Sequence, residues 1–290
     1  MSNNSIYKSE KDRQNFLDLY DRKLKSLNIN YEDIFVETSA GKTHIIVVGD
    51  AGSPPVVLLH GINAGAPVAL ESIKGLSSKY RIYAIDTVGQ AGKSSETQLP
   101  INDESYGKWL SEIFDHLHLE KAVVIGVSYG SVILARLMEY SPQRIEKAIF
   151  VVPIAIVNAR FFQSIFKLLF PMRKFLKTEN DADLLKFIDA YYTETDDFSI
   201  ALQKATLLGV KMDTRRPSLI KTETARKFSA PVYILTAEND IFAPAEKLIK
   251  RSRQIFKNLA AIEILPGSKH VPAQRDHKKI EEIISGWLAD

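Results

Sequence analysis

Cysteine is absent from this chain of 290 residues. Disulfides, thiolate metal sites and a cysteine nucleophile are therefore excluded. No group of residues has the spacing of metal ligands either, so we expect neither a metal nor an organic cofactor.

The sequence also lacks an excess of one charge and long apolar runs. Lys and Arg number 38 against 35 Asp and Glu, with no basic block, so a nucleic-acid partner is not expected. The longest apolar run, ten residues from Ala148, is about half of what a bilayer span needs. The N-terminus has no apolar signal-peptide core. We expect a soluble, cytoplasmic protein without a membrane span.

The first segment with a clear pattern covers residues 7–28. Its apolar residues recur every three or four positions, which predicts an amphipathic helix packed on the body of the protein rather than a membrane or partner helix. These residues are Phe16, Leu17, Tyr20, Leu24 and Leu27. Residues 33–38 and 42–50 follow as a predicted hairpin.

Short apolar runs then alternate with longer helical patterns. The runs are "PVVLLHG", "RIYAIDTVG", "KAVVIGVS", "KAIFVVP", "PVYILTAEND" and "AAIEILPGSKH". Strands that are apolar throughout are covered on both faces, and the intervals suit crossover helices. This predicts an α/β fold with a mainly parallel, doubly wound sheet of about eight strands.

Residues 154–230 interrupt this alternation with helical patterns and no convincing strand. In "ARFFQSIFKLLF", Phe162, Ile165, Phe166 and Leu169 share one face and Phe161 and Leu168 another, so we expect cover on more than one side. The predicted organisation is an N-terminal helix in residues 1–30, a core in 31–153 and 231–290, and a helical cap in 154–230. The cap is expected over the carboxyl edge of the sheet, where ligands bind in open α/β folds.

Ser128 lies between a predicted strand and a predicted helix in the pattern G-x-S-x-G. Gly126 and Gly130 remove Cβ atoms that would clash in a sharp reversal, so the serine can be held in a strained, exposed conformation. The helix start directs free N–H groups toward whatever the hydroxyl attacks. A nucleophilic serine is favoured over a structural turn.

A serine nucleophile needs a base, and the base needs an orienting group. His270 follows the last predicted strand, at the sheet edge where the serine emerges, and is the preferred base. Asp240 follows the preceding strand as the acid, with Glu238 as its competitor. His44, His116, His118 and His277 are interpreted as solvated or packed side chains. The order Ser, Asp, His is that of α/β-hydrolases.

Four motifs in the right order resemble the α/β-hydrolase superfamily from about Ile34 to the C-terminus. They are "LLHG", the elbow "GVSYG", the acid loop "TAENDIFAP" and the histidine loop "PGSKHVP". The resemblance implies an oxyanion hole formed by the backbone N–H groups of Ile62 and Tyr129, with His60 structural rather than catalytic. "DTVGQAGKSS" resembles the family's D-x-x-G-x-G-x-S loop, but Gly92 and Ser94 come one residue late. A phosphate-loop interpretation of its "GKS" fails because the required earlier glycine is missing.

The whole chain looks most like bacterial carboxylesterases with a helical cap. Serine at the elbow argues against the dehalogenase and epoxide hydrolase branches, whose nucleophile is aspartate. We expect hydrolysis of small, hydrophobic carboxylic esters through an acyl-enzyme. Cleavage of C–C bonds, thioesters or lactones, perhydrolysis, and a non-catalytic sensor or partner-binding role remain open. The apolar side chains in the segment 154–230 are equally consistent with an apolar substrate pocket and with simple packing of the cap onto the sheet.

Overall fold

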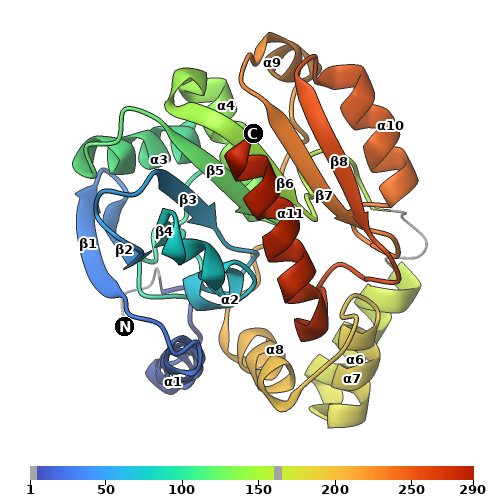
Figure 1. The fold of residues 1–290 in the computed structure, drawn as a ribbon. Helices are drawn as coiled ribbons and strands as arrows, with labels where there is room; N and C mark the ends of the chain where they lie inside the picture. The colour runs from blue at the N-terminus through green and yellow to red at the C-terminus, as the bar shows by residue number, and fades with distance from the viewer. Residues whose placement is uncertain (1–4, 160–164) are drawn as a thin grey trace.

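A computed structural model describes residues 5–159 and 165–290 (Figure 1). Its single sheet has eight strands in the order β1-β2-β4-β3-β5-β6-β7-β8. The strands are β1 (Glu32–Thr38), β2 (Gly41–Val48), β3 (Pro55–Leu59), β4 (Arg81–Ile85), β5 (Ala122–Val127), β6 (Ile145–Val151), β7 (Val232–Ala237) and β8 (Leu259–Leu265). β1 and β2 form the expected antiparallel hairpin, β2 is antiparallel to β4, and the other neighbours are parallel. The predicted fold class is confirmed.

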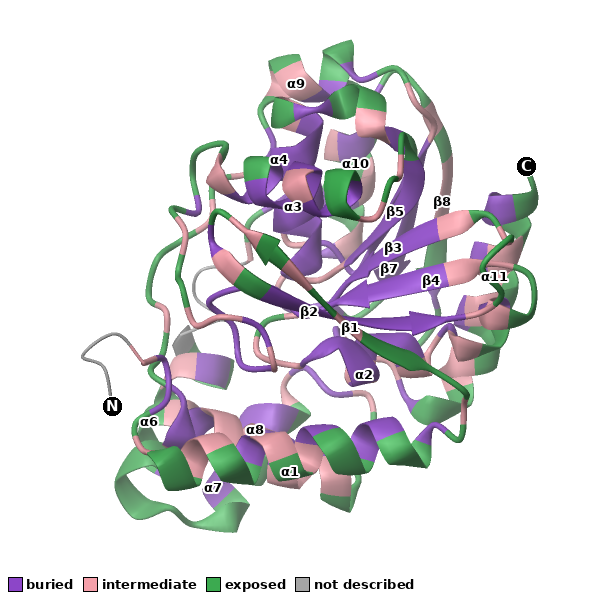
Figure 2. Ribbon diagram, turned by 90° about the vertical axis from the view of Figure 1, so that its left-hand side faces the viewer, coloured by how far each residue is buried: buried purple, intermediate pink, exposed green. Residues whose placement is uncertain are grey.

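Helices cover both faces of this sheet and form the segment inserted between β6 and β7. They are α1 (Glu10–Ser26), α2 (Ala66–Glu71), α3 (Ser105–His116), α4 (Gly130–Tyr140), α6 (Phe170–Thr178), α7 (Asp181–Asp189), α8 (Asp197–Gly209), α9 (Thr222–Lys227), α10 (Ala245–Ile255) and α11 (His277–Ala289). Helices α3, α4, α9 and α10 pack on one face and α1, α2 and α11 on the other, as Figure 2 shows from the side. Each layer closes one apolar cluster, so the central strands are buried on both sides.

Strand β8 departs from the expectation that every later strand is covered on both faces. It forms the edge of the sheet, most of its residues are partly or fully exposed, and Ile264 is 40% exposed. An edge strand has a neighbour on one side alone, so its apolar residues receive less cover.

The predicted N-terminal helix is present as α1. Ser9 caps its first turn, and Phe16, Tyr20 and Leu24 are buried. Just before it, Tyr7 pairs with Val210 at the end of α8 in a short antiparallel bridge. The amide of Lys8 donates to the carbonyl of Gly209 in the same bridge. The N-terminal segment is therefore attached to the helices inserted after β6.

The segment between β6 and β7 contains helices α6 to α9, preceded by a short π-helical turn over Ile165–Leu169. Helices α6, α7 and α8 share a small apolar cluster that includes Phe175 and extends to Ile241, in the loop after β7. In the first predicted helix, residues 160–164 lie outside the described residues. Leu168 is buried as expected, but Phe166 is 66% exposed and lacks the cover that we anticipated.

A helix that spans a membrane must be both long and apolar. Within residues 5–159 and 165–290, no helix is both long enough and apolar enough to cross a bilayer.

Candidate active site

The structure brings the three predicted side chains together. Ser128 Oγ lies 2.7 Å from Nε2 of His270, and Nδ1 of His270 lies 2.8 Å from Oδ2 of Asp240. The three residues follow β5, β8 and β7, whose carboxyl ends meet at one edge of the parallel sheet. If Nδ1 donates to the carboxylate, Nε2 is left as an acceptor for the serine hydroxyl.

The turn that carries Ser128 is tightly packed. Ser128 has a φ of 49°, a left-handed conformation that is strained for a residue with a side chain. A Cβ on Gly126 would lie 2.7 Å from the carbonyl oxygen of Gly130, and a Cβ on Gly130 would overlap that of Leu59. The two glycines therefore permit the close approach that holds the serine at the corner.

Ser131 ties this turn to the chain that follows β6. Its hydroxyl donates to the carbonyl of Ser128 and accepts from the amides of Ile154 (3.1 Å) and Ala155 (3.2 Å). One buried hydroxyl thus joins the turn to the start of the inserted segment.

Asp240 and its competitor Glu238 have different partners. Asp240 is buried, with its side chain 0% exposed, and Oδ1 accepts from the amides of Phe242 (2.8 Å) and Ala243 (3.1 Å). These bonds direct Oδ2 toward His270. Glu238 is exposed and accepts from the amide of Gly267 at 2.7 Å. The geometry favours Asp240 as the orienting acid.

The two amides expected to form an oxyanion hole lie on loops beside the serine. A Cβ on Gly61 would sit 3.5 Å from Cβ of Ser128, so the loop that contains Ile62 contacts the nucleophile turn directly. Among the described residues, no backbone atom accepts a hydrogen bond from the amides of Ile62 and Tyr129. Both amides are therefore available to bind a developing negative charge.

Asn63 and Gln90 lock the loop after β3 to the loop after β4. Oε1 of Gln90 accepts from the amide of Asn63 at 3.0 Å, and Oδ1 of Asn63 accepts from the amide of Ala91 at 3.0 Å. Sequence reasoning missed this pair, because Asn63 belongs to none of the motifs and Gln90 occupies a variable position in the loop "DTVGQAGKSS". The pair fixes the position of the loop that carries Ile62.

His60 is buried below the same loop. Its Nδ1 lies 2.6 Å from the carbonyl of Gly61, and its Nε2 accepts from the amide of Thr87 at 3.1 Å. Burial lowers the pKa of His60, which favours the neutral ring. Both nitrogens are used in holding loops, which agrees with a structural role.

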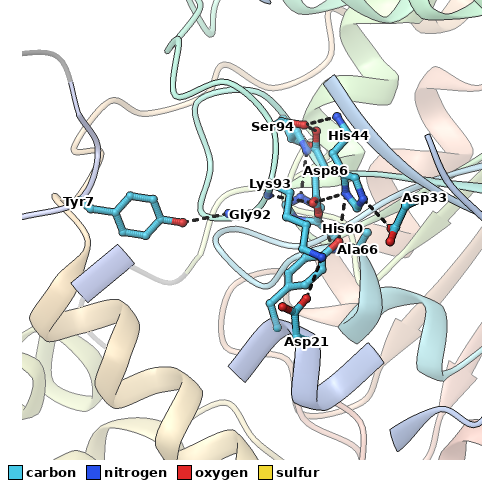
Figure 3. A network of polar contacts seen from close by, with 12 residues as sticks. Tyr7, Asp21, Asp33, His44, His60, Ala66, Asp86, Gly92, Lys93 and Ser94 are labelled. Carbon is cyan, nitrogen blue, oxygen red and sulfur yellow. Dashed lines mark hydrogen bonds and ion pairs between the residues drawn. The ribbon is translucent and has the colours of Figure 1, made fainter. Parts of the chain in front are cut away.

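Figure 3 shows a polar network centred on the buried Asp86, at the end of β4. Its carboxylate accepts from the amides of Ala66 (2.9 Å) and Lys93 (3.0 Å) and lies 2.9 Å from Nδ1 of His44. Burial alone would raise the pKa of Asp86, but the hydrogen bond and charge of His44 hold it below its usual value. The carboxylate is therefore a fixed anion below the site.

The network also accounts for the extra residue in the loop after β4. The loop wraps around Asp86, so the amide of Lys93 reaches its carboxylate while the hydroxyl of Ser94 donates to its carbonyl at 2.6 Å. The hydroxyl of Tyr7 accepts from the amide of Gly92 at 3.1 Å. The N-terminal segment thus supports this loop from outside (Figure 3).

The other histidines lie away from the triad's hydrogen bonds. His116 and His118 are exposed, as interpreted from the sequence, and His277 is half-buried at the start of α11. His44 is fully buried and bound to two carboxylates, a role that its place in a short hairpin strand did not reveal.

Acidic and histidine side chains do not gather into a metal site: within the described ranges, no group of three or more such residues could hold an ion. A cleft of about 740 Å³ lies between the inserted helices and the acid loop. Its lining mixes apolar and charged side chains, including Phe166, Ile241, Lys167 and Asp189, and does not include Ser128.

The comparisons with known proteins agree with this geometry. A model of the α/β hydrolase fold family matches residues 54–182, which include the loop after β3 and the serine turn. The crystal structure of naproxen esterase from Bacillus subtilis superposes on this chain with a TM-score of 0.84 at 21% identity. The match covers 97% of this chain and 99% of the esterase. The chain has the α/β-hydrolase fold.

Proteins similar in sequence include two from Bacillus subtilis. Carboxylesterase YbfK is 25% identical over 285 residues, covering 94% of this chain and 93% of the relative. A protein described as the uncharacterized carboxylesterase nap is 32% identical over 134 residues, 46% of this chain and 45% of the relative. The matches agree with the expected resemblance to bacterial carboxylesterases.

Proposed function

We propose that this α/β-hydrolase is a serine carboxylesterase that works through an acyl-enzyme. The observation that carries the proposal is the continuous hydrogen-bonded line from Ser128 through His270 to Asp240, with distances of 2.7 and 2.8 Å. The likeness to carboxylesterase YbfK over nearly the whole chain supports the choice of an ester among the bonds that such a triad cleaves.

In the acylation step, His270 takes the proton of the Ser128 hydroxyl as the serine oxygen attacks the ester carbonyl. Asp240, held by its own hydrogen bonds, keeps the imidazole oriented and stabilises its positive form. The amides of Ile62 and Tyr129 receive the oxyanion. His270 then protonates the departing alcohol, which leaves the acyl group on the serine.

In the deacylation step, His270 takes a proton from water, which attacks the acyl carbonyl. The same two amides hold the second oxyanion, and the serine leaves with the proton from His270. Loss of one such donor commonly lowers the rate by a factor of about 100 or more. The loop that carries Ile62 therefore contributes to the rate alongside the triad.

The helices in residues 154–230 are proposed to act as a cap that selects the substrate. This proposal is supported by the contact between the apolar cluster of these helices and Ile241, the residue after Asp240. The preference for a hydrophobic ester rests on the many apolar residues in the sequence of this segment. The cleft beside the acid loop does not decide the preference, because its lining mixes apolar and charged side chains. A cytoplasmic location also stays a prediction, which cell fractionation tests.

The proposal is tested with p-nitrophenyl esters from acetyl to octanoyl, alongside thioesters, lactones and amides. Wild-type protein should release a burst of nitrophenol equal to its active sites, and Ser128→Ala should show no burst. Ser77→Ala, whose hydroxyl donates to the carbonyl of Lys74, is a control that should keep full activity.

Two results would contradict the proposal. If wild-type protein released no product from any ester while Ser128→Ala still bound a ligand, a sensor or binding protein would replace the enzyme. If a thioester, lactone or C–C substrate were turned over far faster than every ester, the triad would stand but the substrate class would change. Equal rates on acetyl and octanoyl esters would argue against an apolar acyl pocket.

A further inference from the structure

The loop that carries His270 is bound on both sides of the histidine by one short piece of the inserted segment. The amide of Lys269 donates to Oγ1 of Thr193 at 2.9 Å, and the amide of Val271 donates to the carbonyl of Tyr191 at 2.8 Å. The two residues that flank His270 are thus held by residues that lie just after α7.

Thr193 makes the larger share of these bonds. Besides accepting from Lys269, its hydroxyl lies 2.9 Å from the carbonyl of Val271, to which it donates. Its own amide donates to the same carbonyl at 2.9 Å. A threonine hydroxyl can donate one hydrogen bond and accept two, so this side chain can satisfy both neighbours of His270 at once.

Further contacts join the same two segments. Nζ of Lys269 lies 3.0 Å from Oδ1 of Asp189, at the end of α7. The ring of Tyr191 packs edge-on against Phe242 (centroids 5.6 Å apart), and Phe242 packs edge-on against the His270 imidazole (4.7 Å). The inserted segment therefore supports the imidazole in two ways. It binds the backbone of the His270 loop, and the ring of Tyr191 packs on Phe242, which packs on the imidazole.

The start of the loop is bound to the acid loop, where the amide of Gly267 donates to Oε2 of Glu238 at 2.7 Å. Gly267 has a φ of 68°, and a Cβ there would meet no atom within 4 Å. Beyond Gly267, the position of His270 depends on the contacts of the rest of the loop, which include those to Thr193 and Tyr191. A base works at full rate only if it is held close to its productive geometry, and a displacement of about 1 Å costs roughly 100-fold in rate.

We propose that Thr193 is a positioning residue for the base: its hydroxyl holds the backbone on both sides of His270 so that Nε2 stays within reach of Ser128. The inference rests on the proposed function, because it takes His270 as the general base. It also gives the inserted segment a second task, since the same segment that covers the site would set the geometry of proton transfer.

The test replaces Thr193 with valine and with serine. Thr193→Val keeps the shape and removes the hydroxyl, so kcat for a p-nitrophenyl ester should fall about tenfold, the effect of one lost hydrogen bond, while KM changes less than about twofold. Thr193→Ser keeps the hydroxyl and should restore kcat to nearly the wild-type value. Amide exchange at Lys269, followed by NMR, should be faster in Thr193→Val than in wild type or Thr193→Ser.

Thr178→Val is the matched control. Thr178 lies in the same inserted segment, and its hydroxyl accepts from the amide of Asn180 at 3.3 Å, between α6 and α7. Removing that hydroxyl should leave kcat unchanged. If Thr193→Val does not fold, as judged by circular dichroism, Thr193→Ala removes the same hydroxyl from a half-buried position and takes its place.

Three results would overturn the inference: an unchanged kcat in Thr193→Val, a loss confined to KM, or an equal loss in Thr193→Ser, which would point to the methyl group. Ser128→Ala in the same assay separates this failure from failure of the proposed function. If Ser128→Ala is inactive and Thr193→Val is normal, the positioning role alone is wrong. If Ser128→Ala hydrolyses esters as wild type does, the proposed function fails, and with it the premise of the inference.

Discussion

Nδ1 of His44 lies 2.9 Å from Oδ2 of Asp86, and the two side chains are 0% and 1% exposed. The other ring nitrogen, Nε2, lies 2.8 Å from Oδ1 of Asp33. Each carboxylate can only accept when ionised, so both ring nitrogens must donate, and the doubly protonated imidazolium alone satisfies both bonds. The hairpin β1–β2 is thereby joined to the loop after β4 by a buried charge.

The pH dependence of this joint follows from the two pKa shifts. Burial alone would lower the pKa of His44, but the hydrogen bonds and charges of Asp86 and Asp33 outweigh it and raise the pKa. A raised pKa stabilises the fold below the unfolded value, about 6.5, and the gain is lost as pH rises through the folded value. The lowered pKa of Asp86 stabilises the fold above about 3.9, and that gain is lost as pH falls further.

We predict that His44→Gln destabilises the protein most between about pH 5 and 6.5, where both groups are charged. Removing one partner of a buried ion pair costs about 3 kcal/mol or more, and the loss should shrink as pH rises through the raised folded-state pKa of His44. Urea unfolding at several pH values measures it. The exposed His118→Gln is the control. A destabilisation by His44→Gln that is equal at all pH values would disprove the charged state.

Substitutions at Asp240 and Glu238 should show which carboxylate orients His270. Asp240→Asn should lower kcat by about 10³- to 10⁴-fold, because an amide in place of the carboxylate favours the wrong imidazole tautomer. Glu238→Gln should keep near-normal activity, since Glu238 binds the amide of Gly267. Steady-state kinetics on one activated ester decides between them. The reverse pattern would transfer the acid role to Glu238.

A pair of glycine substitutions should have opposite effects on stability. Gly130→Ala would place a Cβ against the carbonyl of Leu59, so we expect a loss of about 2 kcal/mol or more, together with a displaced Ser128. In α11, Gly286 has no atom within 4 Å of a new Cβ, and Gly286→Ala should raise stability by about 0.5–1 kcal/mol. Denaturant unfolding of both variants checks the pair; a stable Gly130→Ala would mean that the turn is looser than described.

The lock between Asn63 and Gln90 should affect turnover more than binding. Gln90→Met keeps the length of the side chain and removes the acceptor of the Asn63 amide, which frees the loop that carries Ile62. We expect kcat to fall about tenfold with little change in KM, because an oxyanion donor acts in the transition state. A serine-directed phosphonate should also label the variant more slowly than wild type, by about the same factor as the fall in kcat. A change in KM alone would show that the lock serves substrate binding instead.

Much of the fold could be predicted because its signals are local. Buried parallel strands are apolar throughout, and the turn at Ser128 depends on glycines two residues away on either side. Asp240 and His270 could be placed because each follows a strand, and parallel strands bring their carboxyl ends to one edge. The position of β8 at the edge was not predictable from its own residues, since cover depends on what packs beside it.

The contacts that support the site could not be predicted, and for one physical reason. They join loops that are distant in sequence through single backbone groups, which impose no period or composition on the chain. Thr193 reaches Lys269 across 76 residues, and a threonine after a helix has no mark that distinguishes it from any surface threonine. His44 is similar, because a strand residue looks the same whether its partner is water or a carboxylate.

The bridge between Tyr7 and Val210 constrains how this protein can be recombined with its relatives. A chimera that exchanges residues 154–230 alone would place a foreign α8 against the N-terminal segment. The bond from the Lys8 amide to the carbonyl at position 209 would then form only if that helix ended at the same place. The first helix and the inserted helices form one exchangeable part, although about 130 residues of core separate them in the chain. Grafting a new specificity onto this scaffold therefore means transplanting both pieces together.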